Sequence, residues 1–369
     1  MIDERLLKRE ERAIYSLRAL YRRYGYLPYK MSQFEEYDFY LRNKDFLVSD
    51  RVITFTDTDG SLMALKPDVT LSIIKNGEDR PGCKQKLCYN ESVYRVSGRT
   101  KQFKELMQTG LECIGDLDGY DLFEVLRLAA ESLALISDDF VLSVSHLGLL
   151  SALLDPVAPQ GELRRELARC IAQKNLHDLE RLCAAQDAPE GAVQRLIRFA
   201  GLHGPMYSVL PQLEPLCVTE EACTALEELK LLCGLLCTTP YADRIRIDFS
   251  LVGNMEYYNG LIFKGFLSGI WESVLSGGRY DKLMRRMGRT SGAVGFALYL
   301  DLLEGLPGQE RERDVDILLL YDGTTDPVKL AQTVESLVGE GGSVSAQRAI
   351  PEKLRYARLV DLREEARDA

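Results

Sequence analysis

The sequence predicts an α+β fold in which one antiparallel sheet is built from both halves of the chain. Strand patterns occur before residue 115 and return after residue 244. Between them, about residues 146–240 are rich in Leu, Ala, Glu and Arg with helical periodicity. A short β-α-β pattern follows near the end. We therefore expect a main domain over residues 1–305, carrying a helical insertion at about 146–240, and a small α/β appendage over residues 314–369.

An amphipathic helix is expected over residues 3–24, because apolar residues recur on one face of it. These residues are Leu7, Ile14, Leu17, Tyr21 and Tyr24. Gly25 follows directly and suits the C-terminal cap of a helix, since glycine readily adopts a left-handed backbone.

The next segment predicts a hairpin and then a short helix. Strand patterns at 51–56 and 62–65 are joined by Asp57-Thr-Asp-Gly60, which is a typical turn composition. The helix is expected to begin near Pro67-Asp68, because proline fits a first turn and aspartate complements the helix dipole.

Two longer strands are expected at 86–95 and 107–114, on either side of a polar loop at 96–105. A helix is expected at about 119–136, and the helical insertion at 146–240 comes after it.

After the insertion we expect strands at 244–252 and 261–267, followed by helices near 279–288 and 293–304. The appendage would then begin after a linker at 307–313. Its expected elements are strands at 315–321, 343–346 and 357–361, with a helix near 327–338 after the first strand.

The composition argues against some classes of function. The 369 residues are 46% hydrophobic and 28% charged, with a net charge of −10 and a pI of about 5.1. This acidic balance argues mildly against a nucleic-acid partner, which usually needs a basic face. The charged N-terminus and the lack of a long apolar stretch predict a cytoplasmic protein that does not enter a membrane.

The nine cysteines are expected to be free thiols packed as small hydrophobes. Their odd number and the absence of a Cys-x-x-Cys pair argue against a disulfide framework or a zinc site. We expect neither a metal nor a cofactor.

Four segments carry recognisable chemistry. They are Leu65-Lys-Pro-Asp-Val-Thr-Leu71; Tyr94-Arg95 with Gln108-Thr-Gly-Leu-Glu112; Met255-Glu-Tyr-Tyr-Asn-Gly260; and Gly277-Gly-Arg-Tyr-Asp281 with Ala293-Val-Gly-Phe-Ala297. In this order and at these spacings, they resemble the motifs of histidyl-tRNA synthetase, a class II aminoacyl-tRNA synthetase. The resemblance spans about residues 4–304. It implies a six- or seven-stranded antiparallel sheet flanked by helices, a helical insertion and usually a homodimer.

The resemblance also implies a pocket for free histidine. Asp68 and Thr70 match the positions that hold the ammonium group, with Gln108 beside them. Glu112, Tyr257 and Tyr258 match the positions that recognise the imidazole ring. This set makes chemical sense, because an ammonium group needs acceptors and an imidazole needs hydrogen-bond partners and an aromatic wall.

Each of these residues also has a plain structural explanation. Asp68 also suits a helix start, Gln108 and Glu112 would share one face of any strand, and the Tyr257–Tyr258 pair also suits a core. Taken singly, the structural explanation is the better one. Taken together as matches to one pocket, they favour binding.

The departures from the synthetase pattern concern the arginines that stabilise adenylate formation. Arg95 matches one of them and completes the expected pocket, but Gly253 and Leu302 stand where the family has two more. Ser32 replaces a proline of the first family motif, and Tyr299 interrupts a glycine pattern near Leu302. The appendage is also too short for a full anticodon-binding domain.

A synthetase-like body without these arginines resembles the regulatory subunit of ATP phosphoribosyltransferase, the first enzyme of histidine biosynthesis. The resemblance implies a chain that is not catalytic, assembles with the short catalytic subunit, is needed for its activity and senses histidine for feedback inhibition. Two alternatives remain open at this point: an active histidyl-tRNA synthetase and a stand-alone amino-acid-binding paralogue.

Overall fold

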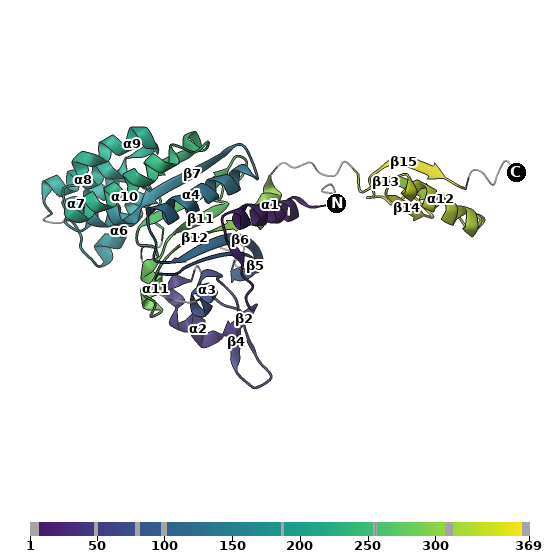
Figure 1. Ribbon diagram of the computed structural model, residues 1–369, viewed down its shortest axis with the longest axis horizontal. Coiled ribbons are helices and arrows are strands. Elements are labelled where there is room, and N and C mark those ends of the chain that lie inside the picture. The colour runs from purple at the N-terminus through teal and green to yellow at the C-terminus, as the bar shows by residue number, and fades with distance from the viewer. Residues whose placement is uncertain are drawn as a thin grey trace. The chain divides into compact units, whose positions relative to one another are not determined.

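The computed structural model describes residues 7–47, 51–77, 82–96, 102–185, 188–253, 255, 257–306 and 313–363. The chain divides into two compact units, Met1–Leu306 and Pro307–Ala369 (Figure 1). The larger unit is considered first.

Among the described residues, nine strands of the larger unit form one mostly antiparallel sheet. In spatial order they are β1 (Leu27–Pro28), β5 (Lys84–Val96), β6 (Phe103–Gly115), β12 (Gly292–Tyr299), β11 (Leu275–Arg279), β10 (Leu261–Leu267), β7 (Phe140–His146), β9 (Ile245–Asp248) and β8 (His203–Pro205). Only two of its pairs, β1 with β5 and β7 with β9, are parallel. The predicted α+β fold with a sheet from both halves of the chain is confirmed, and very short strands at the two edges widen the sheet beyond the expected six or seven.

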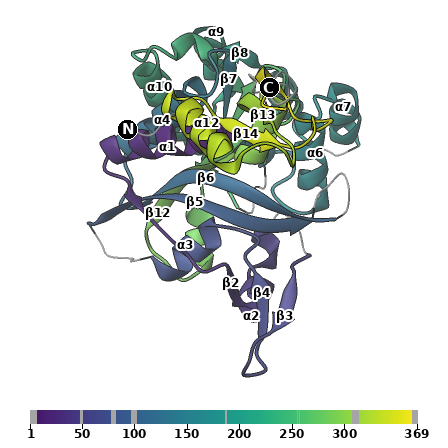
Figure 2. The ribbon, with the colours of Figure 1, turned by 90° about the vertical axis from the view of Figure 1, so that its right-hand side faces the viewer.

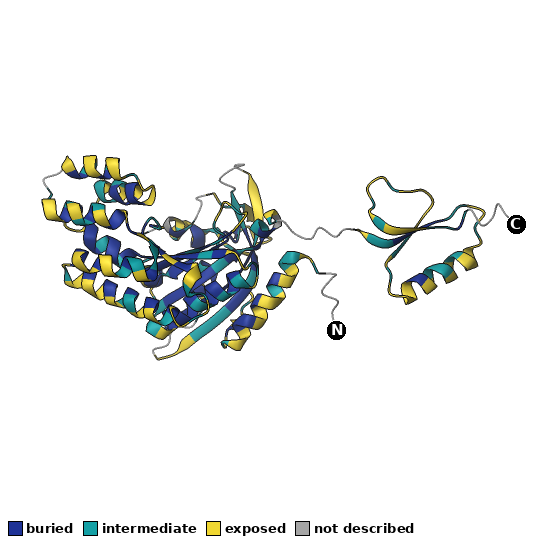
Figure 3. Ribbon diagram, turned by 90° about the horizontal axis from the view of Figure 1, so that it is seen from above, coloured by how far each residue is buried: buried dark blue, intermediate teal, exposed yellow. Residues whose placement is uncertain are grey.

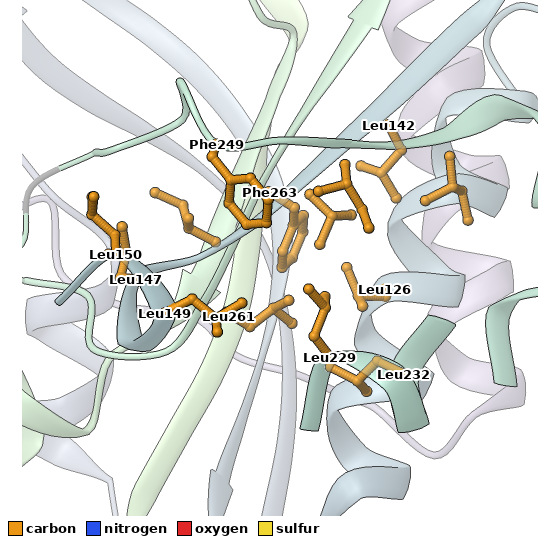
Figure 4. Close-up of a cluster of buried hydrophobic side chains, with 14 of the residues drawn as sticks. Leu126, Leu142, Leu147, Leu149, Leu150, Leu229, Leu232, Phe249, Leu261 and Phe263 are labelled. Atoms are coloured by element: carbon orange, nitrogen blue, oxygen red, sulfur yellow. The ribbon is translucent and has the colours of Figure 1, made fainter. Parts of the chain in front are cut away.

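One face of this sheet is covered by helices. They are α1 (Arg9–Arg23), α4 (Gly119–Ala134), α5 (Leu147–Leu154) and α10 (Glu220–Leu236). Figure 4 shows side chains from α4, α5 and α10 meeting those of β7 and β10, with Leu126, Leu229 and Phe263 among them. We call this packing the helical core.

The inserted helices extend the same core. They are α6 (Glu162–Ala172), α7 (Leu176–Ala184), α8 (Glu190–Ala200) and α9 (Met206–Leu213), with the 3₁₀ turns η3 (Glu214–Leu216) and η4 (Ala242–Arg244). Their buried residues belong to one cluster with the sheet, so the insertion shares the core of the main unit. Figure 3 shows the buried side of these helices turned inward and their exposed side outward. The expectation of an all-helical insertion was wrong at β8, which pairs with β9 at the sheet edge.

The opposite face of the sheet carries smaller elements and a second hydrophobic cluster, the pocket-side core. These elements are η2 (Lys44–Phe46), α2 (Tyr37–Arg42), α3 (Thr70–Asn76), α11 (Asp281–Arg286) and a small sheet of β2 (Phe34–Glu36), β4 (Leu62–Leu65) and β3 (Thr54–Thr56). Figure 2 shows the small sheet on the α3 side of the main sheet. Alternation along β6 serves both faces: Leu111 and Cys113 enter the helical core, and Ile114 enters the pocket-side core.

Several expected elements of the first half are confirmed. Helix α1 ends before Gly25, whose φ of +82° is left-handed, and the Tyr26 N–H closes the cap on the Tyr21 carbonyl at 3.1 Å. The long strands β5 and β6 extend beyond their expected bounds. Helix α3 begins at Thr70, a little later than expected.

The expected helix at 293–304 was wrong. The structure has strand β12 there, followed by the 3₁₀ helix η5 (Leu300–Gly305), and strands β7 and β11 were not predicted. In β12, Val294 and Phe296 face the helical core, while Ala293 and Gly295 lie on the pocket side. Both sides are therefore apolar or small, and such a run has no alternation that separates a buried strand from a buried helix.

Other boundaries also shifted. The strand expected at 244–252 ends at Asp248, and the helix expected near 279–288 is the shorter α11. Strand β11 occupies the residues directly before α11.

The smaller unit has three parallel strands in the order β14 (Val344–Gln347), β13 (Val315–Leu320) and β15 (Tyr356–Asp361). Helix α12 (Pro327–Gly339) connects β13 to β14. Ile317, Leu319 and Leu337 form its own buried cluster with Leu362. The expected strand–helix–strand pattern is confirmed, whereas most of the expected linker, residues 307–312, lies outside the described residues.

Candidate functional site

The predicted site residues come from four segments on the pocket side of the main sheet. Gln108 and Glu112 lie on β6 with Gly110 between them, and Arg95 lies near the end of β5. Asp68 and Thr70 lie at the start of α3. Tyr257 and Tyr258 lie in the loop before β10. Contacts bring these segments together, as follows.

Glu112 is the best-defined residue of the site. It is only 2% exposed, and each of its carboxylate oxygens accepts a hydroxyl hydrogen bond. The Thr70 hydroxyl donates to Oε1 at 2.8 Å, and the Tyr280 hydroxyl donates to Oε2 at 2.5 Å. Loss of hydration raises the pKa of Glu112 to about 8, even though both hydroxyl groups act to lower it.

Asp68 and Arg95 form an ion pair at the N-terminal end of α3. The Arg95 guanidinium lies 3.2 Å from Asp68 Oδ2 and also donates from Nε to the Pro67 carbonyl at 2.6 Å. The other oxygen of Asp68 accepts the Leu71 N–H at 2.9 Å, so Asp68 also caps the helix. A carboxylate and a guanidinium in contact present the two charges that complement an amino-acid zwitterion.

Three glycines make room for side chains that lie flat across the sheet. A Cβ at Gly295 would stand 1.7 Å from Glu112 Oε2, and one at Gly278 would stand 2.8 Å from the Tyr258 ring. A Cβ at Gly110 would meet the Tyr89 hydroxyl at 2.6 Å. The glycines of the sequence motifs therefore form the floor on which Glu112 and Tyr258 rest.

Aromatic rings wall the site. The Tyr257 ring centroid lies 4.6 Å from that of Tyr258, 5.7 Å from Tyr280 and 6.1 Å from Phe46. Burial raises the pKa of Tyr257, Tyr258 and Tyr280 well above the usual value, so these hydroxyls stay protonated and can donate. Such walls suit a flat ring with polar edges.

Gln108 is 2% exposed, and its amide nitrogen has no hydrogen-bond partner among the residues that the structure describes. It faces Glu91 on β5 and Tyr299 on β12 in the strand register. A buried donor without a partner costs about 1–3 kcal/mol. An acceptor on a bound molecule would remove that cost.

Sequence reasoning missed two features of the site. Tyr280 was inside a quoted motif, but only the structure shows that it reaches Glu112, because it follows a strand that was not predicted. The second is an ion pair between Lys66 and Glu91, which lies beside Gln108. No periodicity in the sequence separates this buried pair from the many exposed charges.

At the positions of the two missing arginines, the backbone or the packing disfavours a longer side chain. Gly253 has a φ of +56°, and a Cβ there would stand 2.3 Å from Ile262 Cδ1. Leu302 lies in η5 and packs against the helical core. Neither position presents a cation to the site.

A separate cleft of about 570 Å³ lies between α10 and the sheet, and three of its lining residues, His146, Glu228 and Arg279, are paired with one another. Its lining residues are His146, Glu220, Glu221, Thr224, Ala225, Glu228, Asn259, Gly260 and Arg279. Glu228 lies 3.0 Å from His146 and 3.3 Å from Arg279, which also pairs with Asp281 at 2.8 Å. We place the candidate site at Glu112, where the segments of the sequence motifs meet, rather than in this cleft.

Within the described ranges, no three His, Cys, Asp or Glu side chains are grouped so that they could hold a metal ion. Over the same part of the chain, no helix has the length and apolar character needed to cross a membrane.

Comparisons with known proteins agree on one family. The family model described as histidyl-tRNA synthetase matches residues 2–303. A relative named "ATP phosphoribosyltransferase regulatory subunit" from Alkaliphilus metalliredigens is 28% identical, over 79% of this chain and 75% of its own length.

Two solved structures share the fold. One, titled as an ATP phosphoribosyltransferase regulatory subunit/histidyl-tRNA synthetase from Bacillus halodurans, has a TM-score of 0.76 at 23% identity and covers 98% of this chain and 96% of its own. The other is a chain of the ATP phosphoribosyl transferase (HisG:HisZ) complex from Thermotoga maritima, with a TM-score of 0.62 at 21% identity, covering 81% of this chain and 97% of its own. These likenesses confirm the class II synthetase-like fold.

Proposed function

We propose, from the premise that this chain belongs to the histidyl-tRNA synthetase family, that it is a regulatory subunit of ATP phosphoribosyltransferase and not itself an enzyme. The relatives carry that name, and the chain spans three quarters of the length of the first of them. A catalytic partner is part of this proposal, because a regulatory subunit acts on the activity of another chain. We propose that this partner is the short catalytic subunit and that two copies of this chain form a homodimer.

Free histidine is the proposed ligand. In this proposal the Asp68 carboxylate and the Thr70 hydroxyl bind its ammonium group, with Gln108 beside them, and Arg95 binds its carboxylate. Glu112 and the Tyr257–Tyr258 pair hold the imidazole ring. The observation that carries the proposal is Glu112: a carboxyl group 2% exposed, held by two hydroxyls at the base of an aromatic wall.

Histidine adenylation is not supported by the same site. Stabilising charge on a transferring phosphate takes preorganised cations, and each lost contact of this kind typically costs about 10²–10³ in rate. Gly253 and Leu302 supply no cation, and the left-handed backbone at Gly253 disfavours any residue that has a side chain. A pocket without activation chemistry suits a sensor.

Calorimetric titration with histidine tests the binding proposal. Glu112→Ala should weaken binding by about 1–3 kcal/mol, because it removes an imidazole partner and leaves the Thr70 and Tyr280 hydroxyls unpaired. The matched control is Thr109→Val on the same strand, since the Thr109 hydroxyl donates to the Tyr89 carbonyl and not to the site. This control should bind as the wild type does. Equal affinities for the wild type and Glu112→Ala would place the ligand elsewhere.

A further inference from the structure

We infer that the buried ion pair between Lys66 and Glu91 is a positioning device for the ammonium-binding segment, residues 66–70. This inference rests on the proposed histidine site and adds two residues to it. Neither residue is expected to touch the ligand. Their effect would come through Asp68 and Thr70, which follow Lys66 closely in the chain.

The pair is fully enclosed. Lys66 is 0% exposed, and its ammonium nitrogen lies 2.8 Å from Glu91 Oε2, with the Glu91 side chain only 8% exposed. Glu91 is on β5 directly opposite Gln108 in the strand register. Side chains at such opposed positions lie on the same face of the sheet, so the pair adjoins the row of residues that forms the site.

Stability alone does not account for this pair. Removing two charges from water costs several kcal/mol per ion, and a well-packed apolar pair of similar volume is often equally stable or more so. A single short contact between two charges, in contrast, fixes the relative position of the segments that carry them. We therefore assign the pair a role in placement.

The segment that it places is also held by hydrogen bonds, and on its far side the Lys66 N–H donates to the Gln33 carbonyl at 2.9 Å. Residues 66–69 belong to no helix or strand, and they link β4 of the small sheet to α3. The Lys66 carbonyl accepts the Tyr94 N–H at 2.9 Å, and Arg95 holds the Pro67 carbonyl, so β5 contacts this segment from one side. Among the described residues, the Lys66 side chain contacts the main sheet through this ion pair with Glu91. In this inference the pair helps to hold Asp68 and Thr70 close to Glu112 and Gln108, together with the direct Thr70–Glu112 hydrogen bond.

The experiment compares two double variants of the full chain. Lys66→Met with Glu91→Leu removes the positioning pair. Lys86→Met with Glu124→Leu removes a pair at 2.6 Å that joins the same strand to α4, away from the site. Each variant is measured for thermal stability, for histidine affinity and, without ligand, for hydrogen exchange of the amides of residues 68–71.

The inference expects the first double variant to melt near the wild-type temperature or above it, but to bind histidine at least about tenfold more weakly, since small misplacements of binding groups carry large losses. Its amides at 68–71 should exchange faster. The second double variant should match the wild type in affinity and in exchange at 68–71. Glu91→Gln, which keeps the shape and removes the charge, provides the same two readouts if the double variant does not fold.

Wild-type affinity and wild-type exchange at 68–71 in the Lys66/Glu91 variants would overturn the inference. If the wild type itself does not bind histidine, the proposed function fails, and the exchange rates alone decide the inference. Faster exchange confined to 68–71 would still support a placement role.

Discussion

Glu112 takes its properties from two hydroxyl donors and from the exclusion of water around it. The Thr70 and Tyr280 hydroxyls favour its ionised form, but burial outweighs them and raises its pKa to about 8. An unfolded glutamate titrates near 4.3. The folded chain therefore binds one more proton than the unfolded chain between these two pH values, and Glu112 costs stability as the pH rises through this window.

Glu112→Gln should remove that cost while keeping the shape of the side chain. The melting temperature of the variant relative to the wild type should therefore rise between pH 5 and pH 8, without histidine present. Thermal unfolding across this pH range measures it. A difference that stays constant with pH, or that shrinks as the pH rises, would mean that the carboxyl group is already ionised at pH 5 in the folded protein.

The backbone conformation at Gly253 disfavours replacement of this glycine by any residue that has a side chain. Its φ of +56° and the 2.3 Å approach of a Cβ to Ile262 predict that Gly253→Ala destabilises the protein by about 1–3 kcal/mol. Chemical denaturation measures this.

We also expect Gly253→Arg with Leu302→Arg to leave histidine-dependent ATP–pyrophosphate exchange at the no-enzyme blank. Exchange clearly above the blank would show that only two side chains separate this site from a synthetase.

At the scale of elements, the glycines of β12 and its neighbours determine whether side chains can lie flat on the sheet. Gly295 is the tightest, because a Cβ there would meet Glu112 and also the Leu111 carbonyl at 2.4 Å. A backbone atom cannot move aside as a flexible side chain can. Gly234 in α10 is the opposite case, with no atom within 4 Å of a Cβ.

Gly295→Ala should therefore destabilise the main unit by about 1–3 kcal/mol or more, through overpacking. Gly234→Ala should stabilise it by about 0.5–1 kcal/mol, because alanine is the better helix former. Urea denaturation of the two variants side by side checks both signs. A stable Gly295→Ala variant would show that Glu112 does not occupy the position described.

How far the sequence predicts these elements depends on what covers each face. Strands β5 and β6 and helices α1 and α4 were predicted because their patterns or their flanking residues are distinctive. At strand β12 the pattern wrongly predicts a helix, because the strand is apolar or small on both faces. The candidate site residues are proposed from motif order, whereas the Tyr280–Glu112 hydrogen bond and the Lys66–Glu91 pair depend on long-range packing that no local pattern encodes.

At the scale of the whole molecule, all the proposed ligand-binding residues lie in the unit Met1–Leu306. The helical core and the pocket-side core lie on opposite faces of one sheet, so β5, β6 and β12 contribute to both. Histidine bound on one face would therefore contact strands whose other face supports the helices. In the proposed sensor, these strands therefore connect the histidine site to the helices packed on the other face of the sheet.

The central claim is that histidine binding to this chain regulates a catalytic partner. Such coupling is reciprocal in free energy: each binding event changes the affinity of the other by the same factor. The direct test mixes this chain with the short catalytic subunit of ATP phosphoribosyltransferase and measures activity against histidine concentration, with assembly followed by size-exclusion chromatography. We predict activity mainly in the mixture, suppression by histidine, and a blunted suppression in an Asp68→Ala complex that still assembles. Full histidine sensitivity in an intact Asp68→Ala complex would contradict the account, because feedback would then not pass through this site.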